Sequence, residues 1–134
     1  MRKNYKDILI IDPNKNIAEN YQLMFKDLDF TVDICSSLSR AVQKMKANWF
    51  TCIIMDVDLP EMKGYQAIKI IKMLNSRVKI IVTATQNTRD LETKIREQNI
   101  FYYYLKSFEI DELKQAVCNA INKIKKNTLT RKNV

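Results

Sequence analysis

A nearly unbroken apolar run, Phe50-Thr51-Cys52-Ile53-Ile54-Met55, is followed at once by Asp56-Val57-Asp58-Leu59-Pro60. A short apolar run closed by acids and a proline predicts a buried strand that ends in a solvated loop. Strands that are apolar on both faces are typical of parallel sheets with helices on both sides. This stretch therefore indicates the central strand of an α/β domain.

The sequence on either side of this strand alternates between strand and helix patterns. Further short apolar runs predict strands at Ile8–Ile11, Thr31–Cys35, Val78–Val82 and Phe101–Leu105. Apolar residues at helical spacing predict the intervening helices, which are marked by Ile17–Leu28, Leu38–Met45, Ala67–Leu74, Leu91–Ile95 and Ile110–Ile124. The pattern predicts a doubly wound (βα)5 three-layer sandwich, with a flavodoxin-like parallel sheet of order 2-1-3-4-5.

Length and composition are those of one domain. The 134 residues, 46% of them hydrophobic, suffice for a single core. We expect the domain to span residues 1–126, followed by a basic tail at 127–134 that is too short for an output domain, so the chain either acts alone or is part of a longer protein. No apolar run approaches a membrane span or a signal peptide, which predicts a cytoplasmic location and no membrane partner.

The cysteine and histidine content excludes several kinds of site. Cys35, Cys52 and Cys118 are odd in number and widely spaced, and the chain has no histidine. These facts argue against a disulfide framework, a zinc site and the usual histidine-assisted nucleophiles. We expect buried, reduced thiols.

Charge and glycine content add weaker constraints. The net charge of +8 indicates solvated lysine-rich faces. The chain lacks a nucleic-acid recognition motif, so we expect no specific nucleic-acid partner. Such a charge still allows nonspecific attraction to nucleic acid. Gly64 is the only glycine, so helix ends that require a left-handed residue must use another type. Asp29 and Asn99 stand at such ends and tolerate that conformation best.

Polar residues follow four of the predicted strands. They are Asp12, Asp56, Thr83 and Lys106, after the first, third, fourth and fifth strands. In this topology the carboxyl ends of the strands meet at one edge, where ligands gather. Each residue alone is most often structural, but together they predict a functional site.

These residues carry a resemblance to the receiver domains of bacterial two-component response regulators, from about Asp7 to Lys125. The most specific match is Asp56-Val57-Asp58-Leu59-Pro60-Glu61-Met62-Lys63-Gly64, which resembles the phosphoacceptor strand end and its Leu-Pro and Gly signature. Thr83-Ala84 after the fourth strand and Lys106 after Tyr103-Tyr104-Leu105 fit the same family.

The resemblance implies that Asp56 accepts a phosphoryl group from the phosphohistidine of a sensor histidine kinase or phosphotransfer protein. Asp12, Asp56 and the backbone carbonyl of Asp58 would hold Mg²⁺, and Lys106 would neutralise the phosphoryl oxygens. No enzymatic activity is expected beyond self-phosphorylation and self-dephosphorylation.

The resemblance also implies a switch. Thr83 would hydrogen-bond the phosphoryl oxygen, and Tyr103 would then swing inward and reshape the face made by the fourth helix, fifth strand and fifth helix. That face would contact a downstream protein, and it is where receivers commonly form homodimers.

Two positions depart from the family pattern. Pro13 replaces a second acid after the first strand, which predicts weak Mg²⁺ binding unless Asp12 or Asn14 compensates. Ser107 replaces the proline after Lys106, which predicts a trans Lys106–Ser107 bond. The alternative is therefore a pseudo-receiver, a protein-interaction module that works without phosphorylation. A flavodoxin-like cofactor binder is disfavoured because the loop Asp12–Ile17 lacks a glycine.

Overall fold

The computed structural model describes residues 2–122 as one five-stranded parallel sheet with five helices. The strand order is β2-β1-β3-β4-β5, as the sequence predicts. The strands are β1 (Asn4–Ile11), β2 (Val32–Cys35), β3 (Asn48–Asp56), β4 (Lys79–Ala84) and β5 (Tyr102–Leu105). The predicted basic tail at 127–134, and Ile124 of the last predicted helix, lie outside the described residues.

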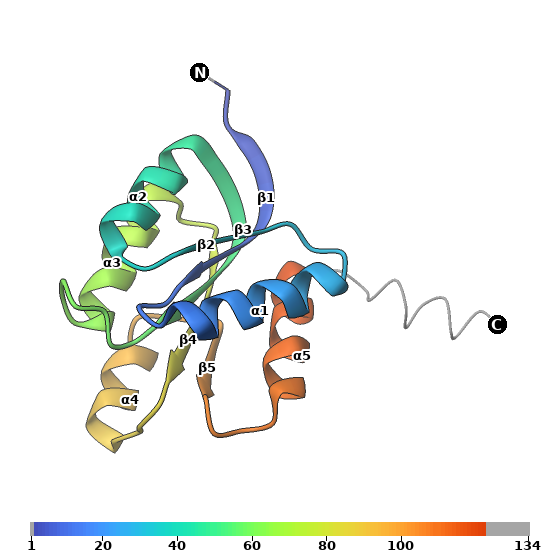
Figure 1. Ribbon diagram of the computed structural model, residues 1–134. Helices are drawn as coiled ribbons and strands as arrows, with labels where there is room; N and C mark the ends of the chain where they lie inside the picture. The colour runs from blue at the N-terminus through green and yellow to red at the C-terminus, as the bar shows by residue number, and fades with distance from the viewer. Residues whose placement is uncertain (1, 123–134) are drawn as a thin grey trace.

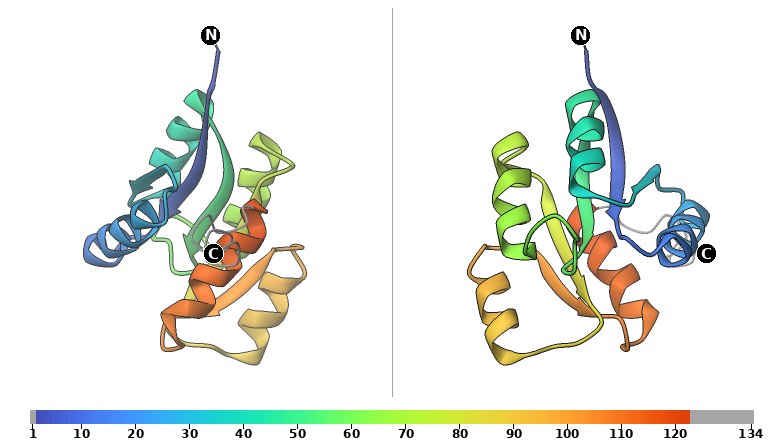
Figure 2. Two further views of the ribbon diagram at one scale, coloured as in Figure 1. Left: turned by 90° about the vertical axis from the view of Figure 1, so that its right-hand side faces the viewer. Right: turned by 60° about the vertical axis from the view of Figure 1, so that its left-hand side comes forward.

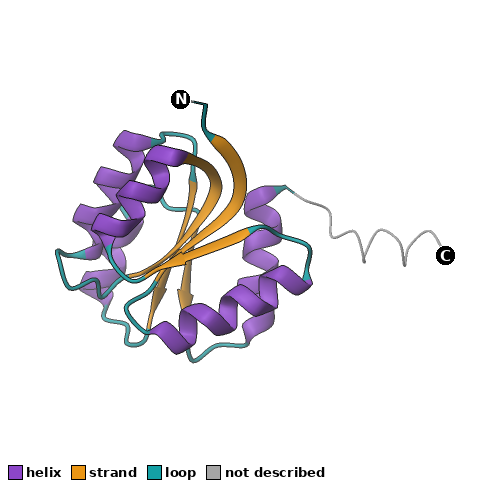
Figure 3. Ribbon diagram, turned by 45° about the horizontal axis from the view of Figure 1, so that its top comes forward, coloured by secondary structure: helices purple, strands orange, loops and turns teal. Residues whose placement is uncertain are grey.

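Helices cover both faces of the sheet (Figures 1 and 3). One face packs against α1 (Lys15–Asp27) and α5 (Ile110–Ile121), around a core that includes Phe25 and Leu113. The other packs against α2 (Leu38–Ala47), α3 (Gly64–Leu74) and α4 (Arg89–Arg96), around Met55, Ile71 and Ile95. β3 lies in the middle of the sheet and contributes side chains to both cores.

Polar side chains begin three of the helices. The side chains of Asn14, Ser37 and Thr88 accept hydrogen bonds from backbone N–H groups in the first turns of α1, α2 and α4. These bonds fix where each helix leaves the loop that follows a strand.

Within residues 2–122, three non-glycine residues adopt the left-handed conformation. The φ angles are +67° at Asp29 and +59° at Asn99, which confirms both predictions. Asn122 ends α5 in the same way, with φ +54°, and the sequence pattern had not singled it out. Asn and Asp pay less than other non-glycine residues for this geometry.

The first and third strands are longer than the apolar runs that predicted them. Asn4–Lys6 pairs with Asn48–Phe50, whereas β2 joins only opposite Ile8 and β4 only opposite Cys52. β1 and β3 therefore extend together beyond β2 and β4 (Figure 2). The extension was not predicted because its side chains are mostly polar. Within it, Trp49 of β3 pairs with Tyr5 of β1, and the ammonium group of Lys3 lies 3.7 Å from the centroid of the Trp49 ring.

The three cysteines are buried and reduced, as predicted. Within residues 2–122, no helix has the length and apolar character required to cross a membrane.

Candidate functional site

The register of the sheet brings the four predicted site residues to one edge. Ile11 lies opposite Met55, so Asp12 follows β1 beside Asp56 at the end of β3. Asp56 lies opposite Thr83 of β4. Lys106 follows β5, and its backbone N–H donates to the carbonyl oxygen of Ala84 (2.8 Å). The backbone ladder therefore aligns four side chains that are up to 94 residues apart in the chain.

Lys106 connects the two carboxylates. Its ammonium nitrogen lies 3.0 Å from Asp12 Oδ2 and 3.6 Å from Asp56 Oδ2. All three side chains are largely shielded from solvent. The ammonium group offsets the repulsion between these two buried negative charges.

Two buried oxygen atoms at this edge lack partners. Asp56 and Thr83 are only 7% and 1% exposed, yet neither Asp56 Oδ1 nor Thr83 Oγ1 has a hydrogen-bond partner within the described part of the chain. A buried polar atom without a partner costs about 1–3 kcal/mol. The two atoms lie on residues that face each other across β3 and β4, so one ligand with suitable polar groups can satisfy both.

Burial raises the pKa of Asp56 above the usual aspartate value, and the nearby Asp12 carboxylate adds to the increase, while Lys106 opposes it. A raised pKa means that the ionised carboxylate is poorly solvated. Such a carboxylate gains stabilisation from a cation or from forming a bond that removes its charge.

The loop after β1 uses its polar groups internally. Both Asp12 oxygens are engaged, since Oδ1 accepts from the backbone N–H of Asn14 (2.8 Å) and Oδ2 from Lys106. The Asn14 side-chain oxygen accepts from the backbone N–H of Ile17 and so caps α1.

The donor set suits a hard cation but is small. Residues 2–122 hold no cluster of three or more His, Cys, Asp or Glu side chains suited to a metal ion. The edge does offer the Asp12 and Asp56 carboxylates, and Asp56 Oδ1 has no hydrogen-bond partner in the described part of the chain. Mg²⁺ usually binds one or two carboxylates and keeps several waters, so these residues fit it in kind.

The loop between β3 and α3 explains the single glycine. A Cβ atom on Gly64 would lie 2.8 Å from Val57 Cγ2 and 3.1 Å from the Val57 carbonyl oxygen. Because the second contact is with backbone, it cannot be relieved by a side-chain rotation. Gly64 is therefore required by the close approach of the start of α3 to the strand end that carries Asp56.

Glu61 holds the same loop to α2. Its carboxylate accepts from the backbone N–H groups of Leu38 (2.7 Å) and Ser39 (2.9 Å), and these bonds lower the pKa of Glu61. This role of Glu61 was not predicted from the sequence. No local pattern links Glu61 to a helix start more than 20 residues earlier.

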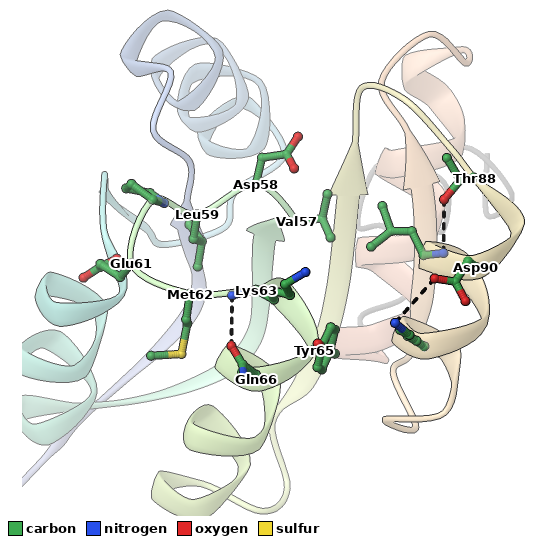
Figure 4. A pocket seen from close by; sticks show the side chains of 14 residues that line it. Val57, Asp58, Leu59, Glu61, Met62, Lys63, Tyr65, Gln66, Thr88 and Asp90 are labelled. Carbon is green, nitrogen blue, oxygen red and sulfur yellow. Dashed lines mark hydrogen bonds and ion pairs between the residues drawn. The ribbon is translucent and has the colours of Figure 1, made fainter.

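A cavity of about 480 Å³ opens beside this loop (Figure 4). The loop residues Asp58, Leu59 and Met62 line it together with Leu91 and Lys94 of α4. Its two walls belong to different elements, so a movement of α4 relative to the loop changes the shape of the cavity.

Tyr103 lies inward in the structure, and its role as a switch stays a prediction. The switch hypothesis has its ring turn inward in response to Asp56, but in the structure Tyr103 is already buried in the core, 6% exposed. The Lys106–Ser107 peptide bond is trans, as predicted, and the described residues contain no cis bond.

Comparison with known proteins gives a consistent result. The family model of the response regulator receiver domain matches residues 8–118. The response regulator ArlR of Staphylococcus haemolyticus is 30% identical over 107 residues, which cover 80% of this chain and 48% of ArlR. The transcriptional regulatory protein ZraR of Klebsiella oxytoca is 20% identical over 86% of this chain and 26% of ZraR. The chain thus spans about half or less of the length of these relatives.

Solved structures share the fold. A CheY-like receiver domain protein from Methanospirillum hungatei superposes with a TM-score of 0.82 at 18% identity, over 90% of this chain and 96% of that one. A putative response regulator from Chloroflexus aurantiacus has a TM-score of 0.80 at 25% identity, over 90% and 100% of the two chains. The aligned edge of Asp12, Asp56, Thr83 and Lys106, together with the family match over most of the chain, shows that this protein belongs to the response regulator receiver domain family.

Proposed function

We propose that Asp56 accepts a phosphoryl group from the phosphohistidine of a sensor histidine kinase or phosphotransfer protein. The proposal rests on two buried oxygen atoms that lack hydrogen-bond partners, Asp56 Oδ1 and Thr83 Oγ1, at the edge where the Lys106 ammonium group pairs with Asp56. A phosphoryl group on Asp56 brings oxygens that accept from Thr83 and Lys106, so it satisfies the hydroxyl and keeps the ammonium paired.

The transfer step is a substitution at phosphorus. A carboxylate oxygen of Asp56 attacks the phosphorus atom, a P–O bond forms, and the P–N bond to the donor imidazole breaks. The electron pair of that bond stays on the imidazole nitrogen, which then takes a proton. The Lys106 charge opposes the negative charge on the phosphoryl oxygens, because phosphoryl transfer depends chiefly on positioning and charge neutralisation.

Mg²⁺ would be held by Asp12, Asp56 and the backbone carbonyl of Asp58, and would supply further charge neutralisation. With proline at position 13, we expect this binding to be weak. The Lys106 ion pair with Asp12 adds a competitor for the same carboxylate.

The output would pass through the face formed by α4, β5 and α5, to a downstream protein or a second copy of the chain. The solution structure of the beryllofluoride-activated NtrC4 receiver domain dimer, similar to this chain with a TM-score of 0.81 at 20% identity, is one precedent for dimerisation in this fold. We propose a cytoplasmic signalling role with no catalysis beyond the domain's own phosphorylation and dephosphorylation.

The test is incubation with Mg²⁺ and acetyl phosphate, followed by measurement of the intact mass. We expect one added phosphoryl group, lost in Asp56→Asn and retained in Asp90→Asn. Asp90 is a matched control because its carboxylate is exposed and pairs with Lys94 on α4. If neither acetyl phosphate nor beryllofluoride modifies the wild-type protein, the proposal is wrong and the pseudo-receiver alternative stands.

A gain-of-function variant tests the metal site separately. Pro13→Asp restores an acid after β1, and we expect it to strengthen Mg²⁺ binding by roughly 10-fold or more. The measurement is a Mg²⁺ titration that follows the backbone amide signals of Asp56 and Asp58 by NMR. An unchanged affinity would show that position 13 does not limit metal binding.

A further inference from the structure

The three consecutive tyrosines of β5 have separate hydroxyl partners. Tyr102 donates to Glu112 Oε2 on α5 (3.2 Å), and Tyr104 donates to the carbonyl oxygen of Phe108 (3.0 Å). Tyr103 instead donates to Asn87 Oδ1 (3.1 Å), in the loop between β4 and α4. Tyr103 is therefore the one member of this triplet whose hydroxyl is bonded to the loop that follows Thr83.

The partner of Tyr103 belongs to a closed set of side chains. Asn87 Nδ2 donates to Glu92 Oε1 (2.8 Å), and Arg96 Nε donates to Glu92 Oε2 (2.7 Å). The Arg96 guanidinium group also lies over the Tyr103 ring, with Cζ 5.6 Å from the ring centroid, and this contact closes the set. We call Tyr103, Asn87, Glu92 and Arg96 the Tyr103 clasp.

Each contact in the clasp has a favourable charge arrangement. Asn87 and Arg96 lower the pKa of Glu92, so its carboxylate is ionised at neutral pH and accepts both bonds. A guanidinium group within about 6 Å of an aromatic ring is attracted to it. The Asn87 amide donates to the Glu92 carboxylate through its nitrogen and accepts from the Tyr103 hydroxyl through its oxygen.

The clasp is independent of the site edge. None of its four contacts includes Asp12, Asp56, Thr83 or Lys106. The inward position of Tyr103 therefore has its own partners on α4 and on the loop before it, and does not depend on a bond from Thr83.

We infer that Asn87, Glu92 and Arg96 are positioning residues that hold Tyr103 inward irrespective of the state of Asp56, so that a signal from Asp56 reaches the α4–β5–α5 face without a turn of the Tyr103 ring. The part of this inference that concerns the face rests on the proposed function. A group on Asp56 would then change the Thr83 and β3–α3 loop region without turning the Tyr103 ring, because a ligand shifts an equilibrium only by its differential interaction with the two states.

The first test uses the protein without any phosphodonor. Its tyrosines are labelled with ¹³C in the ring, and the Tyr103 signal is identified by its loss in Tyr103→Phe. We expect the wild-type Tyr103 shift to be distinct from that of Tyr5, which is 85% exposed. Asn87→Ala should move the Tyr103 signal at least halfway toward the Tyr5 shift, while Gln86→Ala, on the neighbouring exposed residue, should leave it in place.

Thr83→Ala distinguishes the clasp from a switch driven by Thr83. We expect it to leave the Tyr103 signal unchanged. A displacement as large as that in Asn87→Ala would overturn the inference, and so would a wild-type signal that already coincides with Tyr5.

A rescue variant excludes mere loss of folding. Asn87→Asp places a second carboxylate against Glu92 and should release Tyr103. Adding Glu92→Gln to this variant restores a donor toward position 87 and an acceptor for Arg96, and should return the Tyr103 signal toward its wild-type shift. Failure of the double variant to restore the signal would contradict the clasp.

Beryllofluoride then separates the two proposals. Binding is read from the Thr83 amide, and the response of the face from the Tyr103 ring. We expect beryllofluoride to change the chemical shift of the Tyr103 ring at least about 3-fold less in wild type than in Asn87→Ala, because the clasp keeps the population of the inward ring high. An equal response in both would overturn the inference; no shift of Thr83 would contradict the proposed function, and the clasp would then be judged by the variants alone.

Discussion

The helices α4 and α5 both flank β5, but α5 is held mainly by apolar packing and α4 more by polar contacts. α5 buries Leu113, Val117 and three smaller side chains in the core, whereas Ile95 is the one fully buried residue of the shorter α4. α4 depends in addition on the Thr88 cap and the Tyr103 clasp. Apolar burial therefore anchors α5, while α4, with fewer buried apolar contacts, is expected to open at a lower free-energy cost.

The largest expected effect is on the α5 side. Leu113→Ala removes a fully buried side chain and should lower the free energy of unfolding by about 3 kcal/mol, because it leaves a cavity between α5 and the sheet. Urea unfolding measures the change. A loss below about 1 kcal/mol would contradict the view that apolar packing anchors α5.

The equivalent change in α4 should act locally. Ile95→Ala removes the buried anchor of this helix and should cost about 2 kcal/mol. We expect the cost to appear mainly as opening of α4, with amide exchange faster by roughly 30-fold there. Equal acceleration in α5 would remove the distinction between the two helices.

The residues that precede α4 and α5 also differ, and this difference should have a smaller effect on stability. The Thr88 side chain accepts from the N–H of Leu91, so Thr88→Ala should cost about 1 kcal/mol. Glu109 begins α5 without a side-chain cap bond, so Glu109→Ala should change stability by less than about 0.5 kcal/mol. Thermal unfolding of the two variants, compared with wild type, provides the measurement.

The smallest expected effect is a difference in pH dependence. Because its bonds to Asn87 and Arg96 lower the pKa of Glu92 below 4.5, the ionised form stabilises the folded protein. That stabilisation is present above the unfolded pKa and is lost as pH falls through the lower folded value. Amide protection factors in α4, normalised to the intrinsic exchange rate at each pH, should fall in this acidic range more than those in α5, and Glu92→Gln should abolish the difference.

The fold and the site edge could be predicted from the sequence because apolar runs and strand-end residues are local patterns. The runs around Ile53 and Ile81 identify parallel strands, and the topology then brings Asp56 and Lys106 together. The Tyr103 clasp could not be predicted in the same way. Its bond between Asn87 and Tyr103 spans 16 residues and depends on side-chain geometry that no periodicity encodes.

The left-handed turns at Asp29, Asn99 and Asn122 affect the unfolded chain as well as the folded one. Glycine at these positions would relieve strain in the native turns, but it would also increase the number of conformations open to the denatured chain, which costs about 0.4–1 kcal/mol per site. The two effects are of similar size and opposite sign. The near absence of glycine therefore restricts the denatured ensemble, and a chain with a single glycine begins folding with less conformational entropy to lose.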